Sequence, residues 1–419
     1  MIELRPTHLE GAIEIPASKS QTIRAFLIAT FAKAKSAIRH PLLSFDTRSC
    51  IEACRAMGAK IDFNEDQSIA YVDSTNALSG FDSLTIDSGN SGTTLYLLLG
   101  LAASLGVPVT ITGDKQLCSR PIGPLGKSLE ELGAEVKSEN GKPPITIKGP
   151  LIGGHTVIEC KTSQYLSGLL LASPLAKADT SIDCSLLYEK PYVEITLSWL
   201  DSQNIKYEIS DDLEHAKVKG CQNYIGFDSY IAGDFSSAAF FFAAALISKS
   251  TITVKGLDRN DPQGDKEVLQ ILEKMGAAVT WNGNEVTVKG GDEIKGGVFD
   301  LNTMPDALPI LSIVGAFAKS DVKLTNVPQA RIKETDRIAV MCENLKLLGV
   351  EAEEEPDGLI IHGSGSVRGG SVKGYGDHRV IMALAVASAG AKGSIIIDDE
   401  SAAGVTFPTF FDLFNSLKG

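Results

Sequence analysis

The sequence predicts a mixed α/β protein built from six copies of a unit of about 70 residues. In each copy a few small or polar residues open an Ala- and Leu-rich helix. Successive copies lie 71, 72, 73, 70 and 71 residues apart when they are counted on the markers Ser20, Ser91, Ser163, Ser236, Asp306 and Asp377. Self-similarity at a fixed period is the signature of a repeat architecture. We therefore expect this unit to organise the whole chain.

Each unit should contain two helices and several short strands. The first helix, as in "GNSGTTLYLLLGLAASL" from Gly89, is apolar almost all round and is expected to be buried. A strand rich in β-branched residues follows, as in "STITVKG" from Ser250. An amphipathic helix comes next and stops at a glycine or a similar break, as in "LEELGAEV" from Leu129. Glycine there can adopt the left-handed conformation that ends a helix.

The first turns of the six apolar helices carry polar side chains, among them Lys19, Ser163, Asp306 and Arg379. Side-chain caps can satisfy the free N–H groups of a buried helix start, and capping alone is one interpretation. Cations at a helix start oppose the helix dipole, so Lys19 and Arg379 indicate a bound anion instead. Six such helix starts facing a shared cleft would make an anion site.

Composition narrows the classes of function. The 419 residues are 43% hydrophobic, which allows two or more buried cores, and the formal charge of −13 disfavours nucleic acid as a partner. No apolar run is long enough to span a bilayer, and the first residues lack the segments of a signal peptide, so we expect a cytoplasmic protein. The seven cysteines are scattered without a CxxC, which predicts reduced thiols and no metal site.

The octet "RIKETDRI", Arg331 to Ile338, places five charged side chains ahead of an expected helix. On a helix, Lys333 and Arg337 would face each other and destabilise it by about 0.2–0.5 kcal/mol. One interpretation is that Glu334 and Asp336 neutralise a solvated helix start, and the other is that an anionic ligand binds between the cations. The octet alone leaves both alternatives open.

Ten segments in order resemble the 5-enolpyruvylshikimate-3-phosphate synthase family. They run from Pro16 to Phe411: "PASKSQTIRA", "GNSGTT", "RPIGPL", "TSQYLSGLLLA", "KPYVEITL", "GDFSSAAFF", "MPDA", "RIKETDRI", "YGDHR" and "TFPTFF". The resemblance implies a two-domain inside-out α/β barrel with six βαβαββ-type units, three per domain, and an active site in the cleft between the domains. One domain would span 14–231 and carry the shikimate 3-phosphate side; the other would span 1–13 plus 232–419. Hinges are expected near 11–16 and 230–233.

The resemblance also implies an activity in the shikimate pathway, which leads to chorismate and the aromatic amino acids. A member of this family transfers the enolpyruvyl group of phosphoenolpyruvate to the 5-hydroxyl of shikimate 3-phosphate and releases phosphate. The reaction is addition followed by elimination through a tetrahedral intermediate, without a metal or organic cofactor. We expect a monomer whose partners are these two small molecules, with no nucleic acid or membrane partner.

Roles for single residues follow from the family motifs. Asp306 is expected to take the 5-hydroxyl proton, while Glu334 and Lys19 are the candidates for proton exchange at C3 and for stabilising the leaving phosphate. The residues expected to bind shikimate 3-phosphate are Lys19, Ser20, Arg24, Thr162, Ser163, Gln164, Tyr192, Asp306 and Lys333. Those expected to bind phosphoenolpyruvate are Lys19, Asn90, Gly92, Arg120, Gln164, Arg337, His378 and Arg379. His378 would either contact substrate or orient Arg379.

Four positions depart from common family members. Tyr96, Cys118 and Val405 stand where many relatives carry a cation, and Glu189 replaces a frequent serine and brings a carboxylate near the expected shikimate site. Cys118 is expected to be an inert thiol. Two alternatives remain open at this stage. One is the related UDP-N-acetylglucosamine enolpyruvyl transferase, which "KETDR" and "TSQY" disfavour, and the other is a non-catalytic repeat scaffold with capped helix starts.

Overall fold

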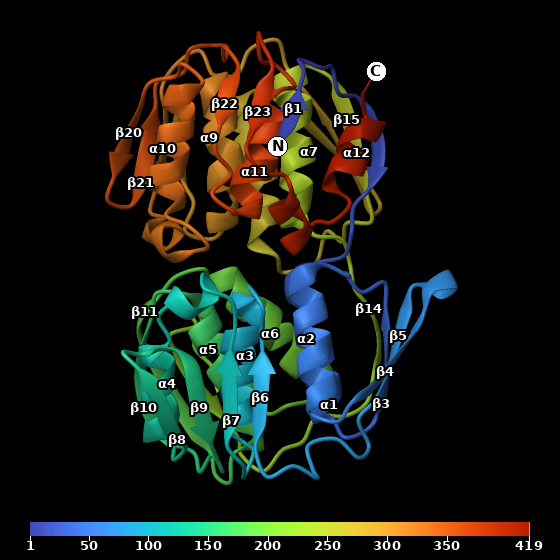
Figure 1. Ribbon diagram of the computed structural model, residues 1–419, viewed down its shortest axis with the longest axis vertical. Coiled ribbons are helices and arrows are strands. Elements are labelled where there is room, and N and C mark those ends of the chain that lie inside the picture. The colour runs from blue at the N-terminus through green and yellow to red at the C-terminus, as the bar shows by residue number, and fades with distance from the viewer. Residues whose placement is uncertain (419) are drawn as a thin grey trace. The chain divides into compact units, whose positions relative to one another are not determined.

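The computed structural model describes residues 1–418, which fold into two compact units. Unit 1 consists of Met1–Pro16 and the chain from Ala232 onward, and unit 2 is Ala17–Ile231. Each unit has its own hydrophobic core. The coarse prediction of an α/β protein with more than one core is therefore confirmed (Figure 1).

Unit 2 contains two kinds of helix. Three are buried almost all round: α1 (Lys19–Phe31), α3 (Gly92–Ala102) and α5 (Ser163–Ala172). Three others bury one face: α2 (Phe45–Ala56), α4 (Gly123–Glu131) and α6 (Lys190–Ser202). Its strands are β3 (Lys35–Arg39), β4 (Lys60–Asn64), β5 (Ile69–Asp73), β6 (Leu84–Asp87), β7 (Val109–Thr112), β8 (Glu135–Glu139), β9 (Lys142–Lys148), β10 (Gly154–Cys160), β11 (Thr180–Leu187), β12 (Tyr207–Ile209), β13 (His215–Val218) and β14 (Asp228–Tyr230).

Unit 1 has the same two kinds of helix. The buried ones are α7 (Phe235–Ser248), α9 (Leu308–Ala316) and α11 (His378–Ala387), which contact one another pairwise. The others are α8 (Val268–Met275), α10 (Arg337–Leu347) and α12 (Phe410–Ser416). Its strands are β1 (Ile2–Leu4), β2 (Gly11–Glu14), β15 (Thr251–Lys255), β16 (Ala278–Asn282), β17 (Glu285–Lys289), β18 (Gly297–Asp300), β19 (Val322–Thr325), β20 (Ala352–Glu355), β21 (Gly358–Ile361), β22 (Gly370–Val372) and β23 (Ile395–Ile397).

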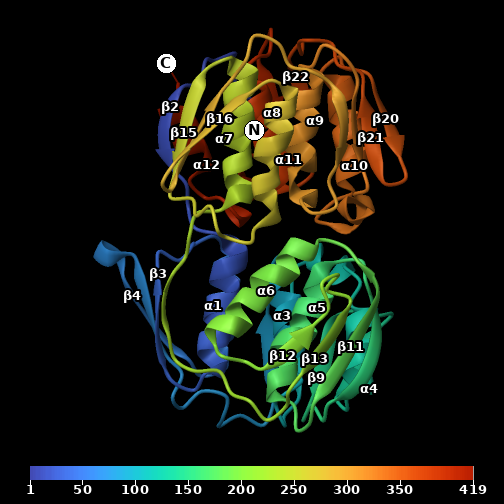
Figure 2. The same ribbon diagram turned by 180° about the vertical axis from the view of Figure 1, so that it is seen from behind.

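Across residues 1–418 the strands form six small sheets, and five of them share one pairing pattern. In the sheet β6-β7-β9-β8, β6 runs parallel to β7 with Leu84 opposite Val109, and β9 pairs antiparallel with both β7 and β8. The sixth sheet, β1-β23-β22, has three strands. Figure 2 shows β11, β12 and β13 of the sheet β10-β11-β13-β12 beside α5 and α6 within unit 2.

Close approach of two buried helices explains two of the glycines in unit 2. A Cβ on Gly100 of α3 would lie 2.1 Å from the carbonyl oxygen of Gly168 on α5. A Cβ on Gly168 would likewise lie 2.6 Å from the carbonyl oxygen of Tyr96. Only a residue without a side chain lets the two backbones approach this closely.

The predicted helix stops are confirmed. Gly58, Gly133, Gly276 and Gly349 follow α2, α4, α8 and α10 with φ values of 94°, 101°, 117° and 79°. These are left-handed conformations that glycine adopts without a steric penalty. Asn204, with φ of 57°, ends α6 in the same way.

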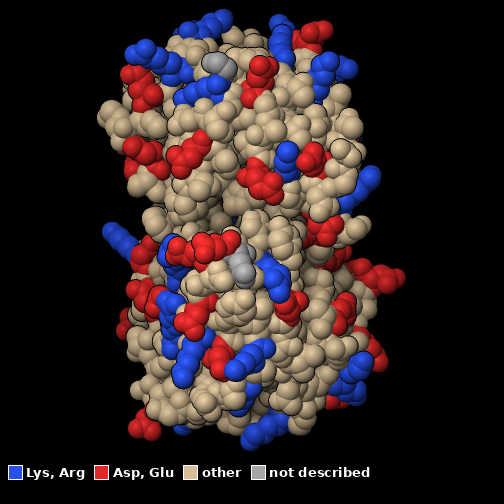
Figure 3. Space-filling view, turned by 90° about the vertical axis from the view of Figure 1, so that its right-hand side faces the viewer, with Lys and Arg blue, Asp and Glu red and all other residues tan. Residues whose placement is uncertain are grey.

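The surface carries side chains of both charge signs, as expected from a sequence with 39 Lys and Arg and 52 Asp and Glu residues. Figure 3 shows acidic and basic side chains interspersed over one face of the molecule. None of the helices within residues 1–418 combines the length and the apolar character needed to cross a membrane.

Candidate active site

The residues predicted to form the site fall into two groups, one in each unit. Unit 2 carries Lys19, Ser20, Arg24, Asn90, Gly92, Arg120, Thr162, Ser163, Gln164 and Tyr192. Unit 1 carries Asp306, Lys333, Glu334, Arg337, His378 and Arg379.

Arg337 is the centre of the group in unit 1. Its guanidinium is 1% exposed and donates to three carboxylates. The donor–acceptor distances are 2.7 Å to Asp306 Oδ1, 2.7 Å to Glu334 Oε2 and 2.8 Å to Asp377 Oδ2. Burial lowers the pKa of Arg337, but the three carboxylates more than offset this effect and raise the pKa above its ordinary value.

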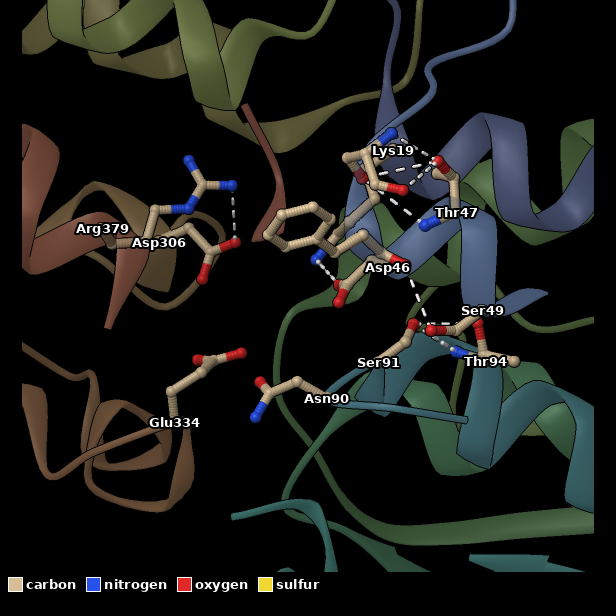
Figure 4. Close-up of polar contacts among 12 residues, drawn as sticks. Lys19, Asp46, Thr47, Ser49, Asn90, Ser91, Thr94, Asp306, Glu334 and Arg379 are labelled. Atoms are coloured by element: carbon tan, nitrogen blue, oxygen red, sulfur yellow. Dashed lines mark hydrogen bonds and ion pairs between the residues drawn. The ribbon is translucent and has the colours of Figure 1, made fainter. Parts of the chain in front are cut away.

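Arg379 is a second buried cation in the same unit. Its Nη2 lies 3.4 Å from Asp306 Oδ2 (Figure 4). Because Asp306 also accepts from Arg337, this one carboxylate bridges both guanidinium groups. Its Nη1 donates to the carbonyl oxygen of Ser236 at 2.9 Å, while its buried Nε has no hydrogen-bond partner among the described residues. Burial lowers the pKa of Arg379 and nearby carboxylates, Asp306 foremost, raise it above the ordinary value.

His378 opens α11 and is 2% exposed. Burial lowers its pKa to about 3, so the imidazole is neutral near pH 7. Its Nδ1 is buried without a hydrogen-bond partner among residues 1–418. A neutral ring beside Arg379 is compatible with either role that the sequence left open.

The octet differs from its predicted geometry. Helix α10 begins at Arg337, with Asp336 as the N-cap whose side chain accepts the N–H of Ala339, and Lys333 has an extended backbone. The expected repulsion between Lys333 and Arg337 on one helix face was therefore wrong, because Lys333 precedes the helix. Arg331 has a structural role, because its guanidinium donates to the Asp336 carboxylate at 2.7 Å.

Lys19 opens the group in unit 2. It is the first residue of α1, and its Nζ lies 3.3 Å from Oδ2 of Asp46, which is in the first turn of α2 (Figure 4). The Lys19 side chain is 15% exposed and that of Asp46 is 4% exposed. The cation at this helix start thus has an anionic partner, but it is a side chain of the chain itself.

Asn90, Gly92 and Arg120 meet at the start of α3. Asn90 Nδ2 donates to Asp114 Oδ2 at 2.7 Å and to Gln116 Oε1 at 2.8 Å, and its Oδ1 accepts from Arg120 at 3.4 Å. A Cβ on Gly92 would lie 2.4 Å from Arg120 Nη1. Gly92 therefore leaves the space that the Arg120 guanidinium occupies.

Two of the departures from the family pattern, Tyr96 and Cys118, make structural contacts near Arg120. Tyr96 is 5% exposed, and its hydroxyl donates to the carbonyl oxygen of Pro121 at 3.2 Å. Tyr165 donates to the same oxygen at 2.7 Å. The Cys118 thiol donates to the carbonyl oxygen of Gly113 at 3.3 Å, and its lack of reactivity stays a prediction.

Thr162 and Ser163 stand at the start of α5, as predicted. Thr162 is the N-cap and accepts the N–H of Gln164 at 3.4 Å. Both hydroxyl groups and the Ser163 N–H donate to Oε2 of Glu189, at distances of 3.1, 3.0 and 3.2 Å. Glu189 is 1% exposed, so this departure from the family pattern is a buried carboxylate on the predicted phosphate site.

Arg24 connects helices of unit 2 and is 1% exposed. It donates to the Ser20 carbonyl oxygen at 2.9 Å, to Thr196 Oγ1 at 2.9 Å and to the Tyr192 carbonyl oxygen at 3.1 Å. Burial lowers the pKa of Arg24 to about 10, so it is still protonated near neutral pH. It also donates to Ser167 Oγ of α5 at 3.5 Å, so the cation connects α1, α5 and α6.

Capping was one of two interpretations of the polar helix starts, and it holds for five of the six buried helices in the described chain. The caps are Ser18, Ser91, Thr162, Asp234 and Asp377. Helix α9 is instead preceded by a 3₁₀ turn, Pro305–Ala307, that holds Asp306. The cations Lys19 and Arg379 contact carboxylate side chains of the chain itself, Asp46 and Asp306, so the bound anion of the second interpretation stays a prediction.

Sequence reasoning did not assign Asp46 or Asp377 to the site. For Asp46 a usable signal was present, because the start of the second helix in a unit returns to the start of the first. Lys19 pairs with Asp46 and Thr162 with Glu189 across 27 residues each. Asn90 donates to the Gln116 side chain across 26 residues, and Gln329 donates to the backbone carbonyl oxygen of Asn302 across 27 residues. The repeat therefore predicts which segments meet.

The chemistry open to these groups is limited. Residues 1–418 contain no group of three or more His, Cys, Asp or Glu side chains arranged to hold a metal ion. Buried guanidinium groups bind phosphates and carboxylates through paired hydrogen bonds, and carboxylates beside them exchange protons with a substrate. The repeated α/β fold with such groups defines an enzyme that acts on small anionic molecules.

Comparisons with known proteins identify the family. Residues 4–414 match the family EPSP synthase (3-phosphoshikimate 1-carboxyvinyltransferase). The 3-phosphoshikimate 1-carboxyvinyltransferases of Acetivibrio thermocellus and Ruminiclostridium cellulolyticum are 46% and 43% identical, over 99% and 100% of this chain and 97% and 98% of theirs. The structure of EPSP synthase from Acinetobacter baumannii matches with a TM-score of 0.83 at 27% identity, over 99% of this chain and 98% of that one. The chain belongs to the EPSP synthase family.

Proposed function

We propose that the chain transfers the enolpyruvyl group of phosphoenolpyruvate to the 5-hydroxyl of shikimate 3-phosphate and releases phosphate. The family match and the names of the relatives support this activity and favour it over transfer to a UDP-sugar and over a non-catalytic scaffold. The observation that carries the proposal is the pair of buried guanidinium groups, Arg337 and Arg379, joined by Asp306. Buried cations of this kind suit two substrates that each carry a phosphate.

We assign the predicted residues to the two substrates as follows. Phosphoenolpyruvate is bound by Lys19, Asn90, Gly92, Arg120, Gln164, Arg337, His378 and Arg379. Shikimate 3-phosphate is bound by Lys19, Ser20, Arg24, Thr162, Ser163, Gln164, Tyr192, Asp306 and Lys333. The burial of Arg120, Arg337 and Arg379 supports the first assignment, because exclusion of water strengthens a contact between opposite charges.

The addition step needs a base for the 5-hydroxyl. In the proposed mechanism this oxygen attacks C2 of phosphoenolpyruvate while C3 gains a proton, which gives a tetrahedral ketal. Asp306 accepts the hydroxyl proton. Its contacts with Arg337 at 2.7 Å and Arg379 at 3.4 Å favour the ionised carboxylate that a base requires.

The elimination step removes a C3 proton and phosphate from the ketal. Glu334 donates the proton to C3 during addition and takes one back during elimination. Its contact with Arg337 at 2.7 Å favours the ionised form, so an anionic substrate that engages Arg337 would favour protonation of Glu334. Lys19 stabilises the leaving phosphate and Asp46 positions its ammonium group.

The domain organisation completes the proposal. Residues 14–231 and residues 1–13 plus 232–419 are domains, each an inside-out α/β barrel of three βαβαββ-type units. Between the two compact units the chain crosses at Pro16 to Ala17 and at Ile231 to Ala232, which supports hinges near 11–16 and 230–233. Both domains contribute residues to the same two substrates and close on binding them. The enzyme acts as a monomer in the cytoplasm.

Phosphate release tests the activity directly. Purified protein is given phosphoenolpyruvate with shikimate 3-phosphate, and in a parallel reaction with UDP-N-acetylglucosamine. Phosphate release with the first acceptor alone is expected. Release with the UDP-sugar alone, or with neither acceptor, would overturn the proposal.

A further inference from the structure

The carboxylate of Glu189 occupies the start of α5, where the proposed function places the phosphate of shikimate 3-phosphate. Glu189 immediately precedes α6 and is 1% exposed. Its φ of 59° is a left-handed conformation that residues other than glycine rarely adopt. Such backbone strain clusters at functional sites. Figure 2 shows α5 and α6 side by side in unit 2.

The number of donor hydrogens shows that Glu189 and a phosphate cannot both be hydrogen-bonded at this site. Each hydroxyl group has one hydrogen to donate. The hydroxyls of Thr162 and Ser163 both donate to Glu189 Oε2, at 3.1 and 3.0 Å, and the Ser163 N–H donates to it at 3.2 Å. With Glu189 in place, these three donors are therefore committed, and a phosphate ester offers only further acceptors and like charge.

Helix capping does not explain why this residue carries a charge. In unit 1, Gln263 Oε1 accepts the N–H of Phe235, the first residue of α7, at 2.9 Å. Glu189 accepts the N–H of the first residue of α5 in the same manner. The two contacts span 28 and 26 residues. A neutral glutamine thus accepts a helix-start N–H at a comparable position, so this capping contact does not by itself require a negative charge.

We propose that Glu189 is an internal anion that holds the phosphate site of α5 and must withdraw its carboxylate before shikimate 3-phosphate binds. This inference rests on the proposed function and makes Glu189 a determinant of acceptor affinity. The hydroxyl groups of Thr162 and Ser163 then donate their hydrogen bonds to the phosphate instead of to Glu189. Gln164 Oε1, in the same helical turn, is buried without a hydrogen-bond partner among the described residues, and a hydroxyl of the acceptor would satisfy it.

Calorimetric titration of shikimate 3-phosphate tests the proposal. Glu189→Gln keeps the shape and the cap but removes the charge, so it should lower Kd about tenfold, the order of one charge-assisted hydrogen bond. Glu189→Asp keeps the charge and should leave Kd close to that of the wild type. Glu194→Gln removes an exposed carboxylate from the same helix and serves as the control with no change. Shikimate, which lacks the phosphate, should bind all four proteins with similar affinity.

The outcomes separate this inference from the proposed activity. If the wild type binds shikimate 3-phosphate and releases phosphate, but Glu189→Gln binds it equally or more weakly, Glu189 is not a competing anion and the activity still stands. A wild type that neither binds nor turns over the substrates overturns both. Should Glu189→Gln fail to fold, Glu189→Ala must show the same gain in affinity, and unchanged or weaker binding by that variant overturns the inference.

Discussion

Replacing His378 by glutamine should change how the stability of unit 1 depends on pH. His378 is buried, and burial lowers its pKa to about 3 from the ordinary 6.5. The folded state therefore binds fewer protons than the unfolded state between these two values. Stability rises with pH wherever the unfolded state binds more protons, so the contribution of His378 is present above pH 6.5 and is lost as the pH falls.

The loss of unfolding free energy on acidification follows from the pH interval between the unfolded-state and folded-state pKa values of His378. Each pH unit below the unfolded-state pKa of 6.5 removes about 1.36 kcal/mol until the folded-state pKa is reached. From pH 7.5 to pH 5.0 the wild type should therefore lose about 2 kcal/mol through this residue, and His378→Gln should lose none of it. Any folded-state pKa below about 4 gives the same result in this window.

Urea unfolding followed by tryptophan fluorescence measures this difference. The chain has two tryptophans, Trp199 in unit 2 and Trp281 in unit 1, so a Trp199→Phe background makes the signal report on the unit that contains His378. In this background, the difference in unfolding free energy between the protein with His378 and the His378→Gln variant should shrink by about 2 kcal/mol from pH 7.5 to pH 5.0.

His362 provides the control with the opposite sign. Glu353 and Asp321 raise its pKa, so its contribution is present at low pH and is lost as the pH rises through the folded-state value. The difference in unfolding free energy between the wild type and His362→Gln should therefore not shrink when the pH is lowered. A difference for His378→Gln that stays constant within about 0.5 kcal/mol would refute a buried, neutral His378.

Three further substitutions test the site. Glu334→Gln should lower kcat by about 10²- to 10⁴-fold with little change in unfolding free energy, and retained activity would remove Glu334 from the mechanism. Gly92→Ala puts a Cβ 2.4 Å from Arg120 Nη1 and should displace that guanidinium. Steady-state kinetics should then show the KM for phosphoenolpyruvate raised about 10- to 100-fold. A KM within about twofold of the wild-type value would contradict the role of Arg120. Arg337→Met leaves three carboxylates without their shared cation and should cost unit 1 about 3–5 kcal/mol in urea unfolding, whereas an unchanged midpoint would show that the network is not a stabilising one.

The sequence was informative wherever a local pattern determines structure. The apolar helices, the strands between them and the left-handed glycines after the amphipathic helices follow from short-range periodicity and from backbone sterics. The octet shows the limit of local reasoning. Charge spacing suggested one helix for Lys333 and Arg337, but the Asp336 cap starts α10 after Lys333. A cap competes with helix propagation, and composition does not reveal which side chain will cap.

Partner choice in the site was the least predictable feature. Arg337 reaches Asp377 across 40 residues and Asp306 across 31, and no local pattern specifies contacts over such separations. The repeat supplies part of this information, because contacts across about 27 residues recur at the starts of paired helices. Only the fold then decides whether such a contact joins a cation to an anion, as for Lys19 and Asp46, or an anion to neutral donors, as for Glu189.

That last distinction explains why carboxylates in the site should differ in their effect on substrate binding. Asp306 neutralises two buried guanidinium groups, and removing its charge would leave them less well compensated in a medium of low dielectric constant. Glu189 receives hydrogen bonds from two hydroxyls and one amide, which are neutral and remain satisfied by a neutral acceptor, as Gln263 illustrates. We therefore expect the charge of Asp306 to stabilise the folded protein, whereas the proposed role of the Glu189 charge is to compete with an incoming phosphate.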